Sequence, residues 1–200
     1  MRKLGAQGLL LVVAGCGLCA HADPILALIP ASGLVTAEPG QTIGWGFSIT
    51  NDTPYYLLID SSNFCGVGGD PFFTDCTDPY NPTTAYGPAL GTYSDLIATN
   101  ATVVSPFSTF TQDFDLTNQV GVGEYTVDPS APLYSVDTGN IYVSYMEFQG
   151  NPFLSGTQVS GDIEFFAPAQ VEVVPEPAAW ALTALPLLLL IWRVRRKRPG

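Results

Sequence analysis

The feature that most limits this chain is the absence of positive charge from most of its length. Between residues 23 and 174 the sequence contains no lysine, arginine or histidine, whereas 17 of its 18 acidic residues lie there, so this segment has a formal charge of −17. A domain made from it has no salt bridges and no cation with which to hold phosphate, nucleic acid or an anionic membrane. We therefore expect no nucleic-acid partner, and a surface suited to a solvated exterior rich in calcium or polysaccharide.

The side-chain pattern of this segment is that of β-strands. The clearest alternation runs through residues 42–50, and its two-residue period places four apolar side chains on one face: Ile43, Trp45, Phe47 and Ile49. Glycine and proline interrupt the segment every 10–15 residues, and outside the two chain ends no stretch has helical periodicity. We therefore predict an all-β fold, an antiparallel β-sandwich of about seven to nine strands over residues 23–167. The expected strands are 25–29, 34–37, 42–50, 55–60, 102–104, 107–115, 123–128, 141–148 and 158–166, with a long exposed loop over 79–88.

Residues 1–22 have the three parts of a secretory signal peptide. Arg2-Lys3 is the basic start, Leu9 to Ala14 is the apolar centre, and Ala20-His21-Ala22 has the small residues of a cleavage site. The mature chain is therefore expected to begin at Asp23. This predicts export, with residues 23–174 on the outer side of the membrane.

The C-terminal end is an uncharged apolar segment followed by a cluster of cations. Residues 178–192 contain no charged side chain and are bracketed by Trp180 and Trp192, as interfacial aromatics bracket a membrane helix. A helix of this length spans roughly 22 Å, less than the ~30 Å hydrocarbon core, but the long basic side chains beyond it can snorkel to the headgroups. We predict a transmembrane helix over 178–192 and a cytoplasmic tail over 193–200, because a buried core helix does not usually end in such a cluster. The expected membrane stop consists of Arg193, Arg195, Arg196, Lys197 and Arg198.

Residues 168–177 are expected to be the linker to this tail, and they end in Pro175-Glu176-Pro177. The ordered triple of this motif, the apolar segment and the arginine-rich end, over about residues 174–198, closely resembles the PEP-CTERM sorting signal of Gram-negative envelope proteins. Pro186 stands where many relatives carry glycine. The resemblance implies recognition by an exosortase, a transpeptidase-like integral-membrane enzyme that cuts near the motif. It also implies temporary anchoring in the inner membrane, and delivery to the cell surface or a secreted polysaccharide matrix.

Two further stretches resemble strands of the immunoglobulin-like ectodomains found on other PEP-CTERM proteins. They are Pro39 to Asn51, which resembles an early strand, and Gly123 to Val127, which resembles a later one. This resemblance covers about 80 residues loosely and implies an immunoglobulin-like sandwich. Fold-level likeness of this kind does not by itself assign a function.

The four cysteines divide into two pairs. Cys16 and Cys19 would leave with the signal peptide, although Val13 to Cys16 also looks like the lipobox of a lipidated cysteine, and that alternative stays open. Cys65 and Cys76 are the mature pair, and in an oxidising compartment they are expected to close a glycine-rich loop with a disulfide. A loop of this size contributes roughly 3 kcal/mol in the chain-entropy description. Two cysteines without a histidine do not supply a zinc site.

The residue types of the mature segment close most catalytic routes. Nucleophilic triads need a histidine or lysine base, and phosphoryl transfer needs a cation or metal clamp, so neither is available here. Paired carboxylates could still hydrolyse a glycosidic bond, and the nominal pairs are Asp113 with Asp115 and Asp75 with Asp78. Because 17 acids over 152 residues produce such pairs by chance, a solvated acidic face is the favoured interpretation. We expect a protein that is not an enzyme.

Two kinds of ligand stay open. Calcium could be held by oxygen side chains on expected turns, at Asp60-Ser61-Ser62-Asn63, Asp70, Asp75 and Asp78, although these residue types also favour turns for backbone reasons. We therefore assign no cofactor and no metal ligands. A glycan could be held by exposed aromatic side chains: Tyr55, Tyr56, Phe72, Phe73, Tyr80 and Tyr86.

The leading hypothesis is thus a non-enzymatic protein of the cell surface or extracellular matrix. Its expected partners are the exosortase-type enzyme and the inner membrane. The alternative hypothesis is a carbohydrate-binding module that recognises an exopolysaccharide.

Overall fold

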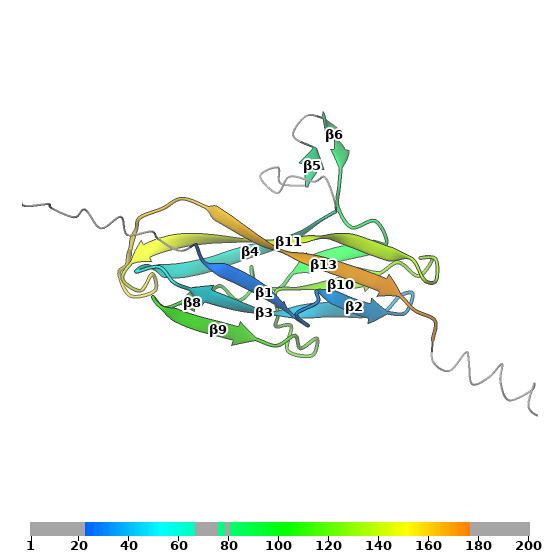
Figure 1. Cartoon of the computed structure of the whole chain (residues 1–200), viewed down its shortest axis with the longest axis horizontal. Coiled ribbons are helices and arrows are strands. Elements are labelled where there is room, and N and C mark those ends of the chain that lie inside the picture. The colour runs from blue at the N-terminus through cyan, green and yellow to red at the C-terminus, as the bar shows by residue number, and fades with distance from the viewer. Residues whose placement is uncertain (1–22, 67–75, 79–80, 177–200) are drawn as a thin grey trace, which may run out of the picture.

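The computed structural model describes residues 23–66, 76–78 and 81–176 (Figure 1). Within these ranges every regular element is a β-strand, so the all-β prediction is confirmed. The predicted signal peptide (1–22), transmembrane helix (178–192) and basic tail (193–200) lie outside the described residues. Among the residues that are described, no helix is long and apolar enough to cross a membrane.

The strands form two sheets that lie face to face, and a small hairpin stands apart from them (Figure 1). In the first sheet the order is β1-β3-β10-β7, with β9 also paired to β3; in the second it is β2-β13-β11-β4-β8, with β12 also paired to β11. The first sheet consists of β1 (Ile25–Ile29), β3 (Thr42–Asn51), β7 (Gly91–Asp95), β9 (Ser108–Gln112) and β10 (Gly123–Val127). The second consists of β2 (Leu34–Ala37), β4 (Tyr56–Gly66), β8 (Thr102–Val104), β11 (Val136–Gln149), β12 (Thr157–Gln158) and β13 (Ile163–Val173). The hairpin is β5 (Thr77–Asp78) with β6 (Asn81–Ala85).

The core lies between the two sheets, and the predicted face of β3 is part of it. Trp45, Phe47 and Ile49 are buried, and Ile43 packs against the same core, so the expected alternation is confirmed. Residues of both sheets share one apolar cluster, to which β3, β4, β11 and β13 all contribute side chains. Burial of this cluster, at ~25 cal/mol per Å² of apolar surface, is the main stabilising contribution available to a domain without ion pairs.

Trp45 joins the core to the first turn of the domain. Its indole Nε1–H donates to the carbonyl oxygen of Gly33 at 2.7 Å, so the one polar atom of this buried ring is satisfied. Its ring lies 6.2 Å from that of Phe64 and 6.4 Å from that of Tyr125. Gly33 has φ +67°, and a Cβ there would lie 2.1 Å from the carbonyl oxygen of Pro168. Glycine is therefore required at this turn.

An extra residue in β4 changes which side chains face the core. Ile59 pairs with Tyr145 and Ser61 with Ser144, so Asp60 has no partner in β11 and forms a bulge. Before the bulge Leu57 and Ile59 point inward; after it the inward positions are Ser62 and Phe64. If β4 were regular and had no bulge at Asp60, the two-residue period would turn Ser61 and Asn63 inward and Ser62 and Phe64 to the outer face.

Strand β13 corrects the predicted end of the domain. It runs to Val173 rather than to residue 166, and Ala169, Val171 and Val173 are buried in the core. The predicted linker over 168–177 was therefore wrong for residues 168–173. Pro168 indicated a linker, but proline is accepted here because the pairing of β13 with β2 begins only at Gln170, so the strand is an edge at Pro168.

The remaining differences concern strand pairing and boundaries. The pair β2–β13 is parallel, so the second sheet is mixed instead of purely antiparallel as predicted. β6 falls within the stretch expected to be a loop, and β7 was not expected at all. β9 ends at Gln112, short of the predicted residue 115.

A buried carboxylate links the two sheets. Asp137 on β11 accepts hydrogen bonds from the hydroxyl of Tyr125 and from the main-chain N–H groups of Ala89 (2.7 Å) and Leu90 (3.2 Å). Burial, followed by the hydrogen bond and the charge of Asp137, raises the pKa of Tyr125, so its hydroxyl remains a donor. These three donors therefore take the place of the lysine or arginine partner that Asp137 does not have within residues 23–174.

We predict that Asp137→Ala lowers the free energy of unfolding by about 2–4 kcal/mol, because it leaves the Tyr125 hydroxyl and the Ala89 N–H without their acceptor. Denaturant unfolding of the disulfide-bonded protein would measure the loss. The matched control is Asp113→Ala, an exposed acid, which should change stability by less than about 0.5 kcal/mol. Equal effects of the two substitutions would contradict this role of Asp137.

Candidate functional site

The outer face of the second sheet carries a row of three side chains, Asn63, Tyr142 and Phe166, which we call the outer row. Tyr142 on β11 is the register partner of Asn63 on β4 and of Phe166 on β13. The alternation of buried residues along β11 turns Ile141 and Val143 inward and so places Tyr142 outward.

The two rings of the outer row lie against each other; Phe166 is exposed and Tyr142 is half-buried. Their centroids are 5.2 Å apart, with an angle of 40° between the ring planes. Phe166 is 58% exposed, which is unusual for a phenylalanine in the middle of a long strand. In the neighbouring row Ser61, Ser144 and Glu164 occupy the corresponding positions. The exposed ring of Phe166 can stack against the apolar face of a sugar ring, and the neighbouring hydroxyl, amide and carboxylate groups can hydrogen-bond its hydroxyls.

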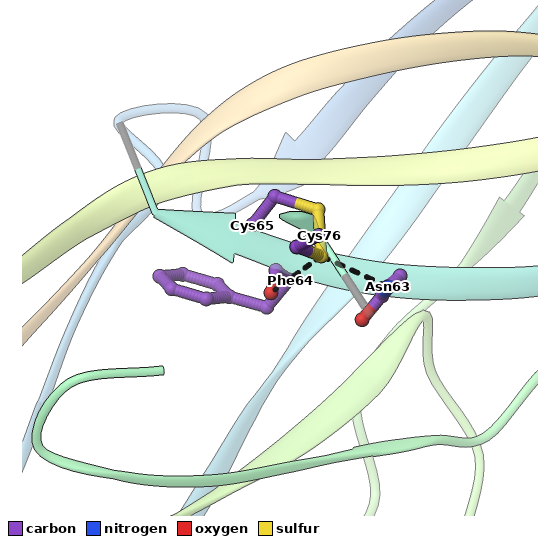
Figure 2. Close-up of a disulfide and its surroundings, with 4 residues drawn as sticks. All are labelled: Asn63, Phe64, Cys65 and Cys76. Carbon is purple, nitrogen blue, oxygen red and sulfur yellow. Dashed lines mark hydrogen bonds between the residues drawn. A yellow bond between two sulfur atoms is a disulfide. The ribbon is translucent and has the colours of Figure 1, made fainter. Parts of the chain in front are cut away.

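The disulfide lies on the same face, at the end of β4. Cys65 is bonded to Cys76, as predicted, and both are buried. Figure 2 shows the pair beside Asn63, whose side-chain amide donates to Cys76 Sγ at 3.0 Å. The main-chain N–H of Tyr86 donates to the carbonyl oxygen of Cys76 at 2.8 Å. The bridge therefore fixes Cys76 next to one end of the outer row.

Those of the expected calcium ligands that lie in the described part of the chain are not gathered into a site. Asp60 to Asn63 lie within β4 instead of on a turn, and Ser62 faces the core, where its Oγ is 2.8 Å from Asp95 Oδ1 and 2.6 Å from the carbonyl oxygen of Val122. Asp70 and Asp75 lie outside the described residues, and Asp78 is in β5. In the described part of the chain no three side chains of histidine, cysteine, aspartate or glutamate gather in a way that could hold a metal ion.

The carboxylate pair Asp113 and Asp115 lies beyond the end of β9, so the expected strand geometry does not apply to it. Asp115 accepts hydrogen bonds from the side chain of Asn118 (2.6 Å) and from the main-chain N–H groups of Thr117 and Asn118. These bonds, that of the Asn118 side chain first, lower the pKa of Asp115. A carboxyl group held ionised in this way does not serve as a general acid. The other nominal pair includes Asp75, which lies outside the described residues.

The aromatic residues expected to bind a glycan are not brought together in the described structure. Tyr56 begins β4 and Tyr55 precedes it, and both are half-buried. Tyr86 is half-buried beside the disulfide. Phe72, Phe73 and Tyr80 lie outside the described residues. The outer row was missed because its members meet only through strand register.

A second group of carboxylates lies at the bulge of β4. Asp95 on β7 accepts hydrogen bonds from the main-chain N–H groups of Ser62 (3.0 Å) and Ile97 (2.7 Å), which links the two sheets. Asp60 has a buried oxygen, Oδ1, without a hydrogen-bond partner. Burial, then the charges of Asp162 and Asp95, raise the pKa of Asp60 above its ordinary 3.8.

This arrangement sets the sign of a pH dependence. Because the folded-state pKa of Asp60 is raised, the folded state binds more protons than the unfolded state just above pH 3.8, and ionisation of Asp60 lowers stability as the pH rises. We predict that Asp60→Asn increases the free energy of unfolding at pH 7, and that this gain disappears below pH 3.8. Asp115→Asn should instead decrease the free energy of unfolding at pH 7, because the pKa of Asp115 is lowered and its ionised form stabilises the fold. Thermal unfolding from pH 3 to pH 7 would test both, and a loss of stability for both variants at pH 7 would contradict the assignment for Asp60.

The comparisons with known proteins add no family assignment. No protein-family model and no curated protein matches this chain. The properties on which a function can rest are those of the chain itself: an acidic segment, residues 23–174, without a cation, an aromatic pair on the outer face of one sheet, and a strand that ends two residues before Pro175.

Proposed function

We propose that the protein is an exported, non-enzymatic protein of the cell surface or extracellular matrix. In this proposal residues 23–174 form an acidic, immunoglobulin-like β-sandwich. The tail directs the chain to an exosortase-type enzyme while residues 178–192 anchor it in the inner membrane. The observation that carries the proposal is the position of the motif. Among the residues described, the last main-chain hydrogen bond joins Val174 N–H to the carbonyl oxygen of Ala37 (2.9 Å), and Pro175 follows directly.

The use that the domain makes of its carboxylates supports a non-enzymatic role. Asp95, Asp115, Asp128 and Asp137 each accept main-chain N–H groups. Hydrogen bonds from Ser130, its side chain first, lower the pKa of Asp128. Carboxylates that accept main-chain N–H groups hold turns and strands in place, which is a structural use and not a catalytic one.

The proposal predicts two separate processing events. Expressed in a Gram-negative host with an exosortase-type enzyme, the chain should lose residues 1–22 and a part of its tail, as measured by the intact mass of the purified protein. The triple variant Pro175→Ala/Glu176→Ala/Pro177→Ala should keep the tail and stay in the membrane fraction, because the recognition motif is gone. Asp113→Ala is the control and should be processed as the wild type. A soluble cytosolic chain with both ends intact would contradict the proposal.

The outer row supports carbohydrate binding as a second candidate function. Tyr142 and Phe166 present aromatic surface beside Asn63 and Glu164, and the disulfide fixes the strand end next to them. With a charge of −17 and no cation in residues 23–174, the domain should repel acidic polymers. The ligand that fits is therefore an uncharged polysaccharide.

We expect Phe166→Ala to weaken retention on a neutral polysaccharide gel about 2- to 12-fold, which corresponds to the ~0.5–1.5 kcal/mol of an aromatic stacking contact. The matched control is Phe153→Ala, a similarly exposed phenylalanine on the loop between β11 and β12, which should leave retention unchanged. Affinity electrophoresis with soluble neutral and acidic polysaccharides would compare the variants. Unaltered migration of the wild type in every polymer would reject this second function.

A further inference from the structure

The end of the sandwich at which β13 finishes is formed by a short loop before β11. The main-chain N–H of Tyr134 donates to the carbonyl oxygen of Val173 at 2.7 Å, and the N–H of Val173 donates to the carbonyl oxygen of Ser135 at 2.9 Å. Residues 132–136, which we call the exit loop, are therefore fastened to the last residue of β13. Figure 1 shows that β11 and β13 end at opposite ends of the sandwich, so the exit loop is far from the loop that follows β11.

The exit loop exposes large apolar side chains. Leu133 is 49% exposed, Tyr134 61% and Val136 50%. Tyr134 also has φ +63°, a left-handed conformation that costs a bulky residue of order 1 kcal/mol or more. Leu133, Tyr134 and Val136 contribute little to the core because all three are exposed. A contribution to the stability of the domain therefore does not explain why this loop carries large apolar side chains.

The length of chain between the fold and the apolar segment limits where this loop can lie. Val174 makes the last hydrogen bond of the fold, and the apolar segment begins four residues later at Ala178. Four residues span at most about 14 Å, whereas the headgroup layer on each side of a bilayer is ~5–8 Å thick. If the apolar segment spans a membrane, the exit loop is held at the membrane surface.

We infer that the exit loop is a lipid-contacting surface, in which Leu133 and Tyr134 enter the headgroup layer and hold the sandwich against the membrane. Leucine and tyrosine suit this depth, since one is apolar and the other pairs an apolar ring with a hydroxyl. The inference rests on the membrane anchoring in the proposed function. Glu172, which pairs with Val136, and Glu176 lie at the same end, and no cation lies within residues 23–174. Zwitterionic headgroups are therefore the expected lipid partner, and anionic headgroups should be repelled.

A tryptophan introduced into the exit loop would report its depth. The full chain carrying Tyr134→Trp, in a background with Trp180→Phe and Trp192→Phe, would be reconstituted in phosphatidylcholine vesicles that contain lipids with quenchers near the headgroup. We expect about a twofold loss of emission for this variant. The control is Phe153→Trp at the opposite end, which should not be quenched, because the 14 residues of β11 separate the two positions by roughly 46 Å. The only other tryptophan, Trp45, is buried and common to both chains.

Flotation of the same samples separates this inference from the function on which it rests. A chain that fails to float with the vesicles overturns both the anchoring and the lipid contact. A Tyr134→Trp chain that floats but is unquenched, or is quenched no more than the Phe153→Trp chain, overturns the lipid contact alone. Crosslinking between copies through position 134 without quenching would assign the loop to a second copy and would also overturn it. Replacing a third of the lipid with phosphatidylglycerol at low salt should reduce the quenching, and an increase would contradict the preference for zwitterionic headgroups.

A double variant tests whether the loop acts on the membrane or only on the fold. Leu133→Ser/Tyr134→Ser should leave the thermal midpoint of the domain within a few degrees of the wild type, because both side chains are exposed. In vesicles it should increase the rotational mobility of a spectroscopic label on the domain, as the sandwich is then held by the tether alone. The matched control, Phe153→Ser/Leu154→Ser, should leave that mobility unchanged, and equal mobility of the two variants would overturn the inference.

Discussion

The structure depends on one constraint: its carboxylates must be satisfied without cations. In most domains a buried or half-buried acid can be paired with lysine or arginine, but residues 23–174 offer neither. Asp137 instead accepts a tyrosine hydroxyl and two main-chain N–H groups, and Asp95 accepts N–H groups from β4 and from its own turn. Each of these two acids is therefore attached to the backbone, and it positions a strand or turn.

Asp60 is a carboxylate that the main chain satisfies only in part, because one of its oxygens is buried without a hydrogen-bond partner. The bulge that it forms turns Ser62 and Phe64 toward the core, and Ser62 is what brings β4 into contact with Asp95. The same bulge leaves one oxygen of Asp60 buried without a hydrogen-bond partner and near two other acids, so the pKa of Asp60 rises. The register of the core and an unfavourable charge thus come from one residue. The inward set of β4 is needed along its whole length, which is why the fold retains the bulge.

The sequence allowed the fold class, the inward face of β3 and the Cys65–Cys76 disulfide to be predicted, because each depends on local spacing. β7 was missed because Gly91 to Asp95 has no apolar alternation; its inward side chains, Tyr93 and Asp95, are polar groups that bond to Ser62. The outer row could not be predicted either. Its aromatic pair depends on the register between β11 and β13, strands separated by a loop and by β12, and no local pattern contains that information.

The position of β13 between β2 and β11 determines when the domain can finish folding. β2 has only β13 as its partner in the second sheet, and three core side chains come from the last five residues of that strand. A polypeptide that emerges with its N-terminus first therefore displays an unpaired β2 and an open core until residue 173 is free. Closure must wait for the final eleven-residue strand, so maturation of the sandwich is timed by the arrival of the very segment that precedes the tail.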